Sequence, residues 1–84
     1  MSYFIYILYS ELSGKYYVGH TGDTLDERIR KHNSNHIGFT GRSNDWKLVY
    51  KEISPDKAAA LKREMEIKSW KSRKRIESLI CSTK

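Results

Sequence analysis

The start of the chain carries two apolar and aromatic runs that are separated by a short polar turn. The first run, Tyr3–Ser10, has the continuous aromatic and aliphatic character of a strand buried on both faces. Residues 11–15 contain Gly14 and have turn composition, and the second run covers residues 16–19. Two such runs across so short a connection predict a β-hairpin, and this pairing constrains the rest of the fold.

A first helix is predicted from residue 24 to about residue 34. Thr24 followed by Glu27 has the spacing of a capping box, in which each side chain satisfies a free backbone amide of the first turn. The inward face is marked at positions i, i+4 and i+7 by Leu25, Ile29 and His32. Residues 33–45 are polar and rich in Gly and Asn, so we expect a long loop of the kind that often has a functional role.

One more strand and two helices are predicted in the second half of the chain. Residues 46–53 have strand composition, and Ser54 and Pro55 are suited to the N-cap and first position of a helix that runs to about Ser69. A final helix is capped by Ser72 and turns three apolar side chains inward, Ile76, Leu79 and Ile80. The predicted order is ββαβαα, which is an α/β (α+β) fold with a small three-stranded sheet.

The composition restricts the class of protein. A chain of 84 residues is expected to form one domain, residues 1–84, with a thin core. No apolar stretch approaches the roughly 20 residues needed to span a bilayer, and the N-terminus lacks the basic segment of a signal peptide. Cys81 is the only cysteine, which excludes an internal disulfide and a cysteine zinc cage. We therefore expect a cytoplasmic protein without membrane association.

The charge of the chain indicates an acidic partner. The 16 Lys and Arg residues outnumber the 10 Asp and Glu residues, giving a net charge of +6. Residues 68–75 read Lys-Ser-Trp-Lys-Ser-Arg-Lys-Arg, with no acidic residue. Such a segment either solvates a helix end or neutralises phosphates, and nucleic acid is the partner that the overall charge favours. Trp70 is either a core side chain or a platform on which a base stacks.

Some polar and aromatic side chains are predicted to meet on one face of the sheet. Antiparallel pairing of the hairpin can bring the hydroxyl groups of Tyr6 and Tyr17 together, although both can equally be core aromatics. Arg28 and His32 share one face of the first helix, next to its apolar stripe. The alternatives are a solvent-facing arginine and a histidine satisfied in the core. A guanidinium group beside an apolar stripe needs a partner.

Glu64 borders the buried stripe of the second predicted helix. One carboxylate is too little for a zinc site. It is sufficient for magnesium, which keeps most of its waters and binds one protein carboxylate together with substrate phosphates. The alternative is an i, i+4 ion pair with Lys68, which would contribute little to stability.

Several short segments occur in an order that resembles the GIY-YIG nucleases. These segments are Phe4-Ile5-Tyr6-Ile7-Leu8, Tyr16-Tyr17-Val18-Gly19-His20-Thr21, Arg28-Ile29-Arg30-Lys31-His32-Asn33, Trp46-Lys47-Leu48-Val49-Tyr50 and Lys62-Arg63-Glu64. The resemblance covers residues 3–80. It is strongest to small stand-alone bacterial members and extends to the N-terminal nuclease domain found in the excinuclease ABC system. The chain departs from the pattern at Phe4, where the first motif has glycine, and at His20, where some members have lysine.

The resemblance implies a three-stranded antiparallel sheet flanked by helices, and it implies a role for individual residues. The residues that it implies to be catalytic are Tyr6, Tyr17, Arg28 and His32. It also implies that Glu64 binds the metal and that His20 is an auxiliary residue. The basic residues expected to hold nucleic acid are Lys68, Lys71, Arg73, Lys74 and Arg75.

The function implied is that of a metal-dependent endonuclease, a hydrolase that cleaves phosphodiester bonds with Mg²⁺ or Mn²⁺. DNA is favoured over RNA as the substrate, in DNA repair or processing, and a protein partner could supply substrate recognition. Two alternatives remain open at this point. One is a nucleic-acid-binding module without turnover, and the other is a subunit that is active only with a partner.

Overall fold

The computed structural model describes residues 2–34 and 45–82. Within these residues the elements follow the predicted ββαβαα order of an α+β fold. In chain order they are β1 Tyr3–Ser10, β2 Lys15–Thr21, α1 Leu25–Ser34, β3 Lys47–Ser54, α2 Lys57–Ser69 and α3 Arg73–Cys81. Most of the predicted loop at residues 33–45 lies outside the described residues. No helix in the described part of the chain is long and apolar enough to cross a membrane.

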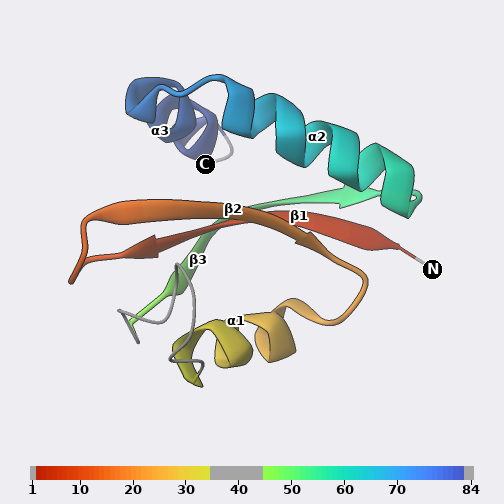
Figure 1. The fold of residues 1–84 in the computed structure, drawn as a ribbon, viewed down its shortest axis with the longest axis horizontal. Coiled ribbons are helices and arrows are strands. Elements are labelled where there is room, and N and C mark those ends of the chain that lie inside the picture. The colour runs from red at the N-terminus through yellow and green to blue at the C-terminus, as the bar shows by residue number, and fades with distance from the viewer. Residues whose placement is uncertain (1, 35–44, 83–84) are drawn as a thin grey trace.

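The sheet has the strand order β2-β1-β3, and β1 pairs antiparallel with both neighbours. The hairpin is confirmed, and its register sets Tyr6 opposite Gly19 and Leu8 opposite Tyr17. An irregularity between Ile7 and Leu8 shifts the register of the β1–β3 pairing. Helices α2 and α3 cover one face of the sheet, and α1 covers the other (Figure 1). The central strand is therefore buried from both sides, as its continuous apolar run predicts.

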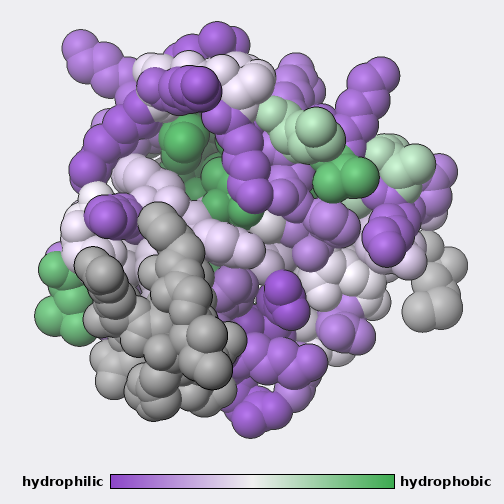
Figure 2. Space-filling model, in the orientation of Figure 1, coloured by the Kyte–Doolittle hydropathy of each residue, from purple (hydrophilic) through white to green (hydrophobic). Residues whose placement is uncertain are grey.

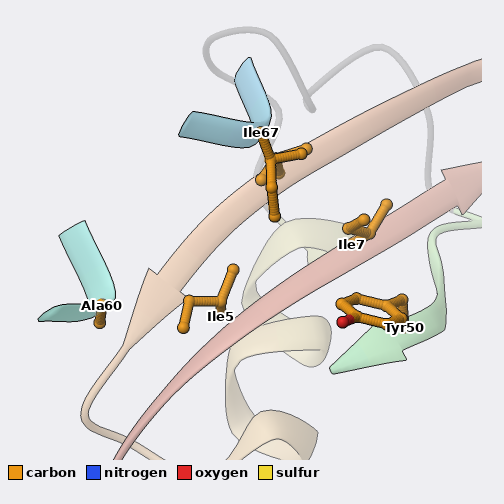
Figure 3. Close-up of a cluster of buried hydrophobic side chains, with 6 residues drawn as sticks. Ile5, Ile7, Tyr50, Ala60 and Ile67 are labelled. Atoms are coloured by element: carbon orange, nitrogen blue, oxygen red, sulfur yellow. The ribbon is translucent and has the colours of Figure 1, made fainter. Parts of the chain in front are cut away.

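Alternate residues of β1 enter two different hydrophobic clusters, as the two-residue period of a strand requires. Ile5 and Ile7 face α2 and pack with Ala60 and Ile67, as Figure 3 shows. Tyr6 and Leu8 face α1, where Trp46, Leu25 and Ile29 contact them. Each fully buried aliphatic side chain stabilises the fold by about 1.5–3 kcal/mol, so β1 is the main source of cohesion between the two helical layers.

The helix starts were predicted with unequal success. In α1, Thr24 Oγ1 accepts a hydrogen bond from the Glu27 amide at 3.3 Å, which is one half of the predicted capping box; the Glu27 carboxylate bonds to Arg30. In α3 the predicted cap is also confirmed, because Ser72 accepts from the Arg75 amide. Its three inward residues pack against the α2-side core cluster: Ile76, Leu79 and Ile80.

The predicted start of α2 at Ser54 and Pro55 is wrong. Ser54 is the last residue of β3, where it is buried and pairs with Tyr3. The helix begins at Lys57, and Asp56 is its N-cap, whose side chain accepts from the Ala59 amide at 2.8 Å. Strand pairing and burial of Ser54 therefore outweighed its preference for a helix cap.

Two polar side chains join segments that are far apart in the sequence. Asp45 accepts hydrogen bonds from Ser10 Oγ at 2.6 Å and from the Leu12 amide at 3.0 Å, which fixes the β1–β2 turn. Asn33 pairs with the backbone of Trp46, accepting from its amide at 2.7 Å and donating to its carbonyl at 3.0 Å. The end of α1 is thus anchored to the start of β3.

Candidate active site

The hydroxyl group of Tyr6 is the meeting point of the residues predicted on the α1 face of the sheet. The Tyr6 side chain is fully buried, with a relative exposure of 0%. Arg28 Nε donates a hydrogen bond to its oxygen at 3.1 Å, and His32 Nε2 lies 3.1 Å from the same oxygen. The predicted convergence of Tyr6, Arg28 and His32 is present, and the guanidinium group beside the apolar stripe has its partner.

The electrostatics of this group define its protonation state. Burial raises the pKa of Tyr6, although the hydrogen bond and positive charge of Arg28 act in the opposite direction. Burial, followed by the charge of Arg28, lowers the pKa of His32. A neutral phenol that already accepts from Arg28 has its own proton left to donate. Neutral His32 lies within hydrogen-bond reach of that proton, and its tautomer decides which of the two groups donates.

Tyr17 is the second tyrosine of this face, and it lies on the edge strand β2. Its ring centroid is 4.6 Å from that of His32 and 6.3 Å from that of Tyr6. Tyr17 is half-buried, and it is also one of the residues that line an open groove at the edge of the strand. The ammonium group of Lys68 lies 5.9 Å from the ring centroid. Tyr17 is therefore the tyrosine of this pair that solvent or a substrate can reach.

Gly19 is a part of the site that the sequence analysis did not single out. A Cβ atom at this position would lie 2.6 Å from the Tyr6 hydroxyl oxygen and 2.8 Å from Tyr6 Cζ. Glycine is therefore required for the close approach of the phenol to β2. The available signal was the antiparallel register, which places the glycine after Tyr17 and Val18 directly opposite Tyr6.

Glu64 lies on α2, on the opposite side of the sheet from α1. It is buried, with 9% relative exposure, and faces inward together with Ala60 and Ile67. His20 Nδ1 bonds to its Oε1, and Lys68 Nζ lies 2.6 Å from its Oε2. Burial alone would raise the pKa of Glu64, but the hydrogen bonds from Lys68 and His20 outweigh burial and lower it.

Edge strand β2 separates the two halves of the candidate site. Gly19 faces Tyr6 on the α1 side, whereas His20 turns to Glu64 on the α2 side. The two halves are electrostatically coupled, because the negative charge of Glu64 contributes to the raised pKa of Tyr6. The structure thus places His20 on the carboxylate, a pairing between residues 44 positions apart that the sequence analysis did not predict.

The predicted basic segment divides between two surfaces. Lys68, Lys71 and Arg73 line the groove beside β2. Lys74 and Arg75 line a smaller hollow together with Trp70, and the guanidinium carbon of Arg75 lies 4.5 Å from the Trp70 ring centroid. Trp70 is half-buried and packs against the α2-side core cluster, so the core interpretation is confirmed for part of this side chain.

The residues around Glu64 are compatible with a divalent metal ion. Within residues 2–34 and 45–82 there is no cluster of three or more His, Cys, Asp or Glu side chains that could hold a metal by themselves. Glu64 supplies one ionised carboxylate, which suits Mg²⁺ or Mn²⁺ with the remaining ligands from water and phosphate. It already attracts a cation, the ammonium of Lys68, whose side chain is 50% exposed and can move into solvent. The donor type and local charge therefore fit, provided that Lys68 is displaced.

Comparison with known proteins agrees with this arrangement. The GIY-YIG catalytic domain is matched by residues 2–77. The UPF0213 protein of Staphylococcus saprophyticus is 36% identical over 76 residues, covering 89% of this chain and 90% of that protein. A UPF0213 protein of Staphylococcus aureus has the same identity and coverage. The solution structure of the UPF0213 protein from Bacillus halodurans aligns with a TM-score of 0.60 and 34% identity, covering 96% of this chain and 84% of that one.

The chain therefore belongs to the GIY-YIG family. Members of this family are generally nucleases, so their substrate is nucleic acid, and they typically use a divalent metal ion. The UPF0213 names state no specific function.

Proposed function

We propose that this protein is a metal-dependent endonuclease that hydrolyses phosphodiester bonds of DNA in repair or processing. The observation that carries the proposal is the Tyr6 hydroxyl held between Arg28 and His32, with the ionised carboxylate of Glu64 on the other side of β2. We place the activity in the cytoplasm, where the exposed Cys81 thiol stays reduced.

The reaction is an in-line hydrolysis in one step. A water oxygen forms a bond to phosphorus while the bond from phosphorus to the 3′-oxygen breaks. Tyr17 takes the proton of the water as the general base, because it is the accessible tyrosine of the pair.

Arg28 binds the phosphate that is attacked. Its Nε is used on Tyr6, while its terminal Nη groups make no hydrogen bond to the described residues. They can therefore donate to the non-bridging oxygens, on which negative charge builds in the transition state. Loss of one such donor typically costs about 2.7–4 kcal/mol of barrier height. Tyr6 and His32 act as positioning residues, because they hold the guanidinium and neither needs to touch the substrate.

Glu64 would hold the divalent ion. When bound, the ion would supply positive charge that stabilises the negative charge developing on the phosphate and on the leaving 3′-oxygen. His20 keeps the carboxylate ionised and oriented through its bond to Oε1. Lys68 must leave Oε2 for the ion to bind, and the phosphates of the substrate provide another anionic partner for its ammonium group.

The test is a cleavage assay on labelled duplex, flap, junction and single-stranded DNA and RNA, with Mg²⁺ or Mn²⁺. Glu64→Gln and Tyr17→Phe should each lower cleavage at least a hundredfold. Glu66→Gln, an exposed position on the same helix, and Tyr3→Phe, at the other end of the sheet, are the matched controls and should cleave normally. Cleavage that survives both site variants would refute the assignment of these residues.

One observation favours a second candidate, a subunit that cleaves only with a partner protein. Both Glu64 oxygens are bonded to side chains of the chain itself, so the carboxylate is closed to a metal until Lys68 moves. This candidate predicts salt-sensitive binding to nucleic acid without cleavage under any metal, as does a non-catalytic binding module. Addition of the partner would restore cleavage only for the subunit.

A further inference from the structure

An open groove runs along the outer edge of β2, beneath the corner where α2 passes into α3. Its volume is about 670 Å³, within the range of about 300–1,000 Å³ that is typical of sites for small molecules. The floor is apolar and consists of Val18, Ile67 and Ile76. Figure 2 shows hydrophobic surface at the bottom of a hollow ringed by hydrophilic side chains, where Figure 1 places α3 above β2.

The walls of the groove are aromatic and cationic. Tyr16 and Tyr17 lie along it, and its lining includes several basic side chains but no carboxylate. The basic lining residues are Lys15, Lys68, Lys71 and Arg73. The guanidinium carbon of Arg73 lies 5.4 Å from the ring centroid of Tyr16, and Glu77 fixes both side chains by hydrogen bonds from behind. The groove therefore combines flat apolar surface with positive charge.

Lys71 occupies the mouth of the groove in an unusual conformation. Its φ of 49° lies in the left-handed region, which glycine adopts without steric cost and a lysine only with strain. Its ammonium group has no hydrogen bond or ion pair with the part of the chain that the structure describes. Lys71 directly follows Trp70, the C-cap of α2, where a left-handed residue commonly ends a helix. Its backbone therefore serves the helix end, and its exposed ammonium group is available to a ligand in the groove.

We propose that this groove binds one unpaired nucleotide of the substrate strand, beside the phosphate that is cleaved. The base lies on the apolar floor next to Tyr16, and its phosphate is bound by Lys71. A base inside a duplex has both faces covered by its neighbours, so only an unstacked base can make these contacts. This inference rests on the proposed function, and it makes single-stranded or unpaired nucleic acid the preferred substrate class.

The groove is continuous with the candidate active site. Tyr17 is one of the residues that line the groove, and its ring centroid lies 4.6 Å from that of His32. Lys68 also lines the groove, and its ammonium group bonds to Glu64. A strand that is bound in the groove therefore leads directly to the residues proposed to carry out hydrolysis, and its phosphates can draw Lys68 away from the carboxylate.

The experiment is a binding titration of the metal-free protein, in which no cleavage is needed. Fluorescence anisotropy is measured with a labelled oligothymidylate, with an abasic strand of the same length and charge, and with a duplex. The oligothymidylate should bind most tightly. Lys71→Gly should weaken its binding about three- to tenfold and lower the slope of log K against log salt concentration by about 0.7, the contribution of one phosphate contact.

The choice of glycine separates binding from folding. Glycine adopts a φ of 49° without steric cost, so Lys71→Gly should unfold at the same urea concentration as the parent protein or at a higher one. Lys57→Ala removes the same charge at the opposite end of α2, and it should leave base-dependent binding unchanged. If the abasic strand or the duplex binds as well as the oligothymidylate, or if both variants behave alike, the subsite is refuted.

The two proposals fail in different ways. Normal metal-dependent cleavage together with unchanged binding in Lys71→Gly would leave the nuclease standing and remove the subsite. Base-dependent binding that is lost in Lys71→Gly, together with no cleavage under any metal, would leave the subsite standing and remove the nuclease.

Discussion

Gly19→Ala should both destabilise the protein and disable its candidate active site. The new methyl group would lie 2.6 Å from the Tyr6 hydroxyl oxygen, about 0.8 Å below the 3.4 Å at which ordinary van der Waals contact begins. The phenol has little freedom to retreat, because it is fully buried and bonded to Arg28 and His32. One partner must therefore give way, and the hydrogen bonds of Tyr6 are the contacts that a shift would break.

The loss of stability caused by Gly19→Ala is estimated from three contributions. Overpacking of a well-packed interior costs about 1–3 kcal/mol, and weakening a hydrogen bond of the Tyr6 network costs about 1 kcal/mol more. Replacing glycine by alanine in the unfolded chain offsets about 0.4–1 kcal/mol of this loss. The net effect is a destabilisation of about 2 kcal/mol, or roughly 10 °C in Tm for a domain of this size. A phenol displaced by a large fraction of an ångström should also lower cleavage at least tenfold.

Urea unfolding and the cleavage assay measure the two effects. Gly22→Ala is the matched control, because its methyl group would come within 2.9 Å of the ring of Tyr3, which is half-buried and not part of the candidate site. It should cost less stability and leave cleavage intact. In a Tyr6→Phe background, Gly19→Ala should cost less than in the parent, since the closest contact, with the hydroxyl, is gone and only the contact with Cζ at 2.8 Å remains. A Gly19→Ala protein as stable and active as the parent would refute the reasoning.

Further predictions concern charge. Lys68→Met should increase the affinity of the nucleic-acid-free protein for Mn²⁺, because the ammonium group no longer competes for Glu64 Oε2. Calorimetric titration would measure the increase, and equal affinities in the variant and the parent would contradict the prediction. The lowered pKa of His32 means that the unfolded chain takes up a proton first as the pH falls below about 6.5, so stability should decrease there. His32→Gln should flatten this part of a plot of Tm against pH, and an unchanged slope would rule out His32 as its cause. Arg63→Ala should lower the free energy of unfolding by about 1–2 kcal/mol in urea, since it removes a half-buried, bidentate ion pair with Glu52. A loss of stability indistinguishable from zero would show that the pair is merely a surface contact.

The sequence predicts the fold well where local pattern and tertiary packing agree. The continuous run of β1, the Thr24 and Ser72 caps and the element order are all confirmed. The start of α2 fails because Ser54 has two competing preferences, a cap in the local sequence and a ladder partner in the sheet. The position of β1 between β2 and β3 also cannot be predicted from local sequence pattern, since strand order depends on pairings between distant segments.

The candidate site likewise has a part that local sequence pattern predicts and a part that depends on tertiary packing. The i, i+4 spacing of Arg28 and His32 is local, and the approach of both to Tyr6 follows from the apolar stripe of α1. The bond between His20 and Glu64 cannot be predicted from local sequence spacing, because it depends on how α2 packs over β2. The need for a glycine at position 19 likewise appears only when the Tyr6 ring is in place.

Glu64 stands in the same inward stripe of α2 as two core residues, Ala60 and Ile67, both with 0% exposure. The carboxylate is therefore aligned with the sheet by the same packing that holds the helix down. A change of volume at Ala60 or Ile67 would slide or tilt the helix and carry Glu64 with it. Selection for activity in this protein should consequently constrain core positions that never contact a substrate, and a screen for altered metal preference should recover variants in the hydrophobic interior.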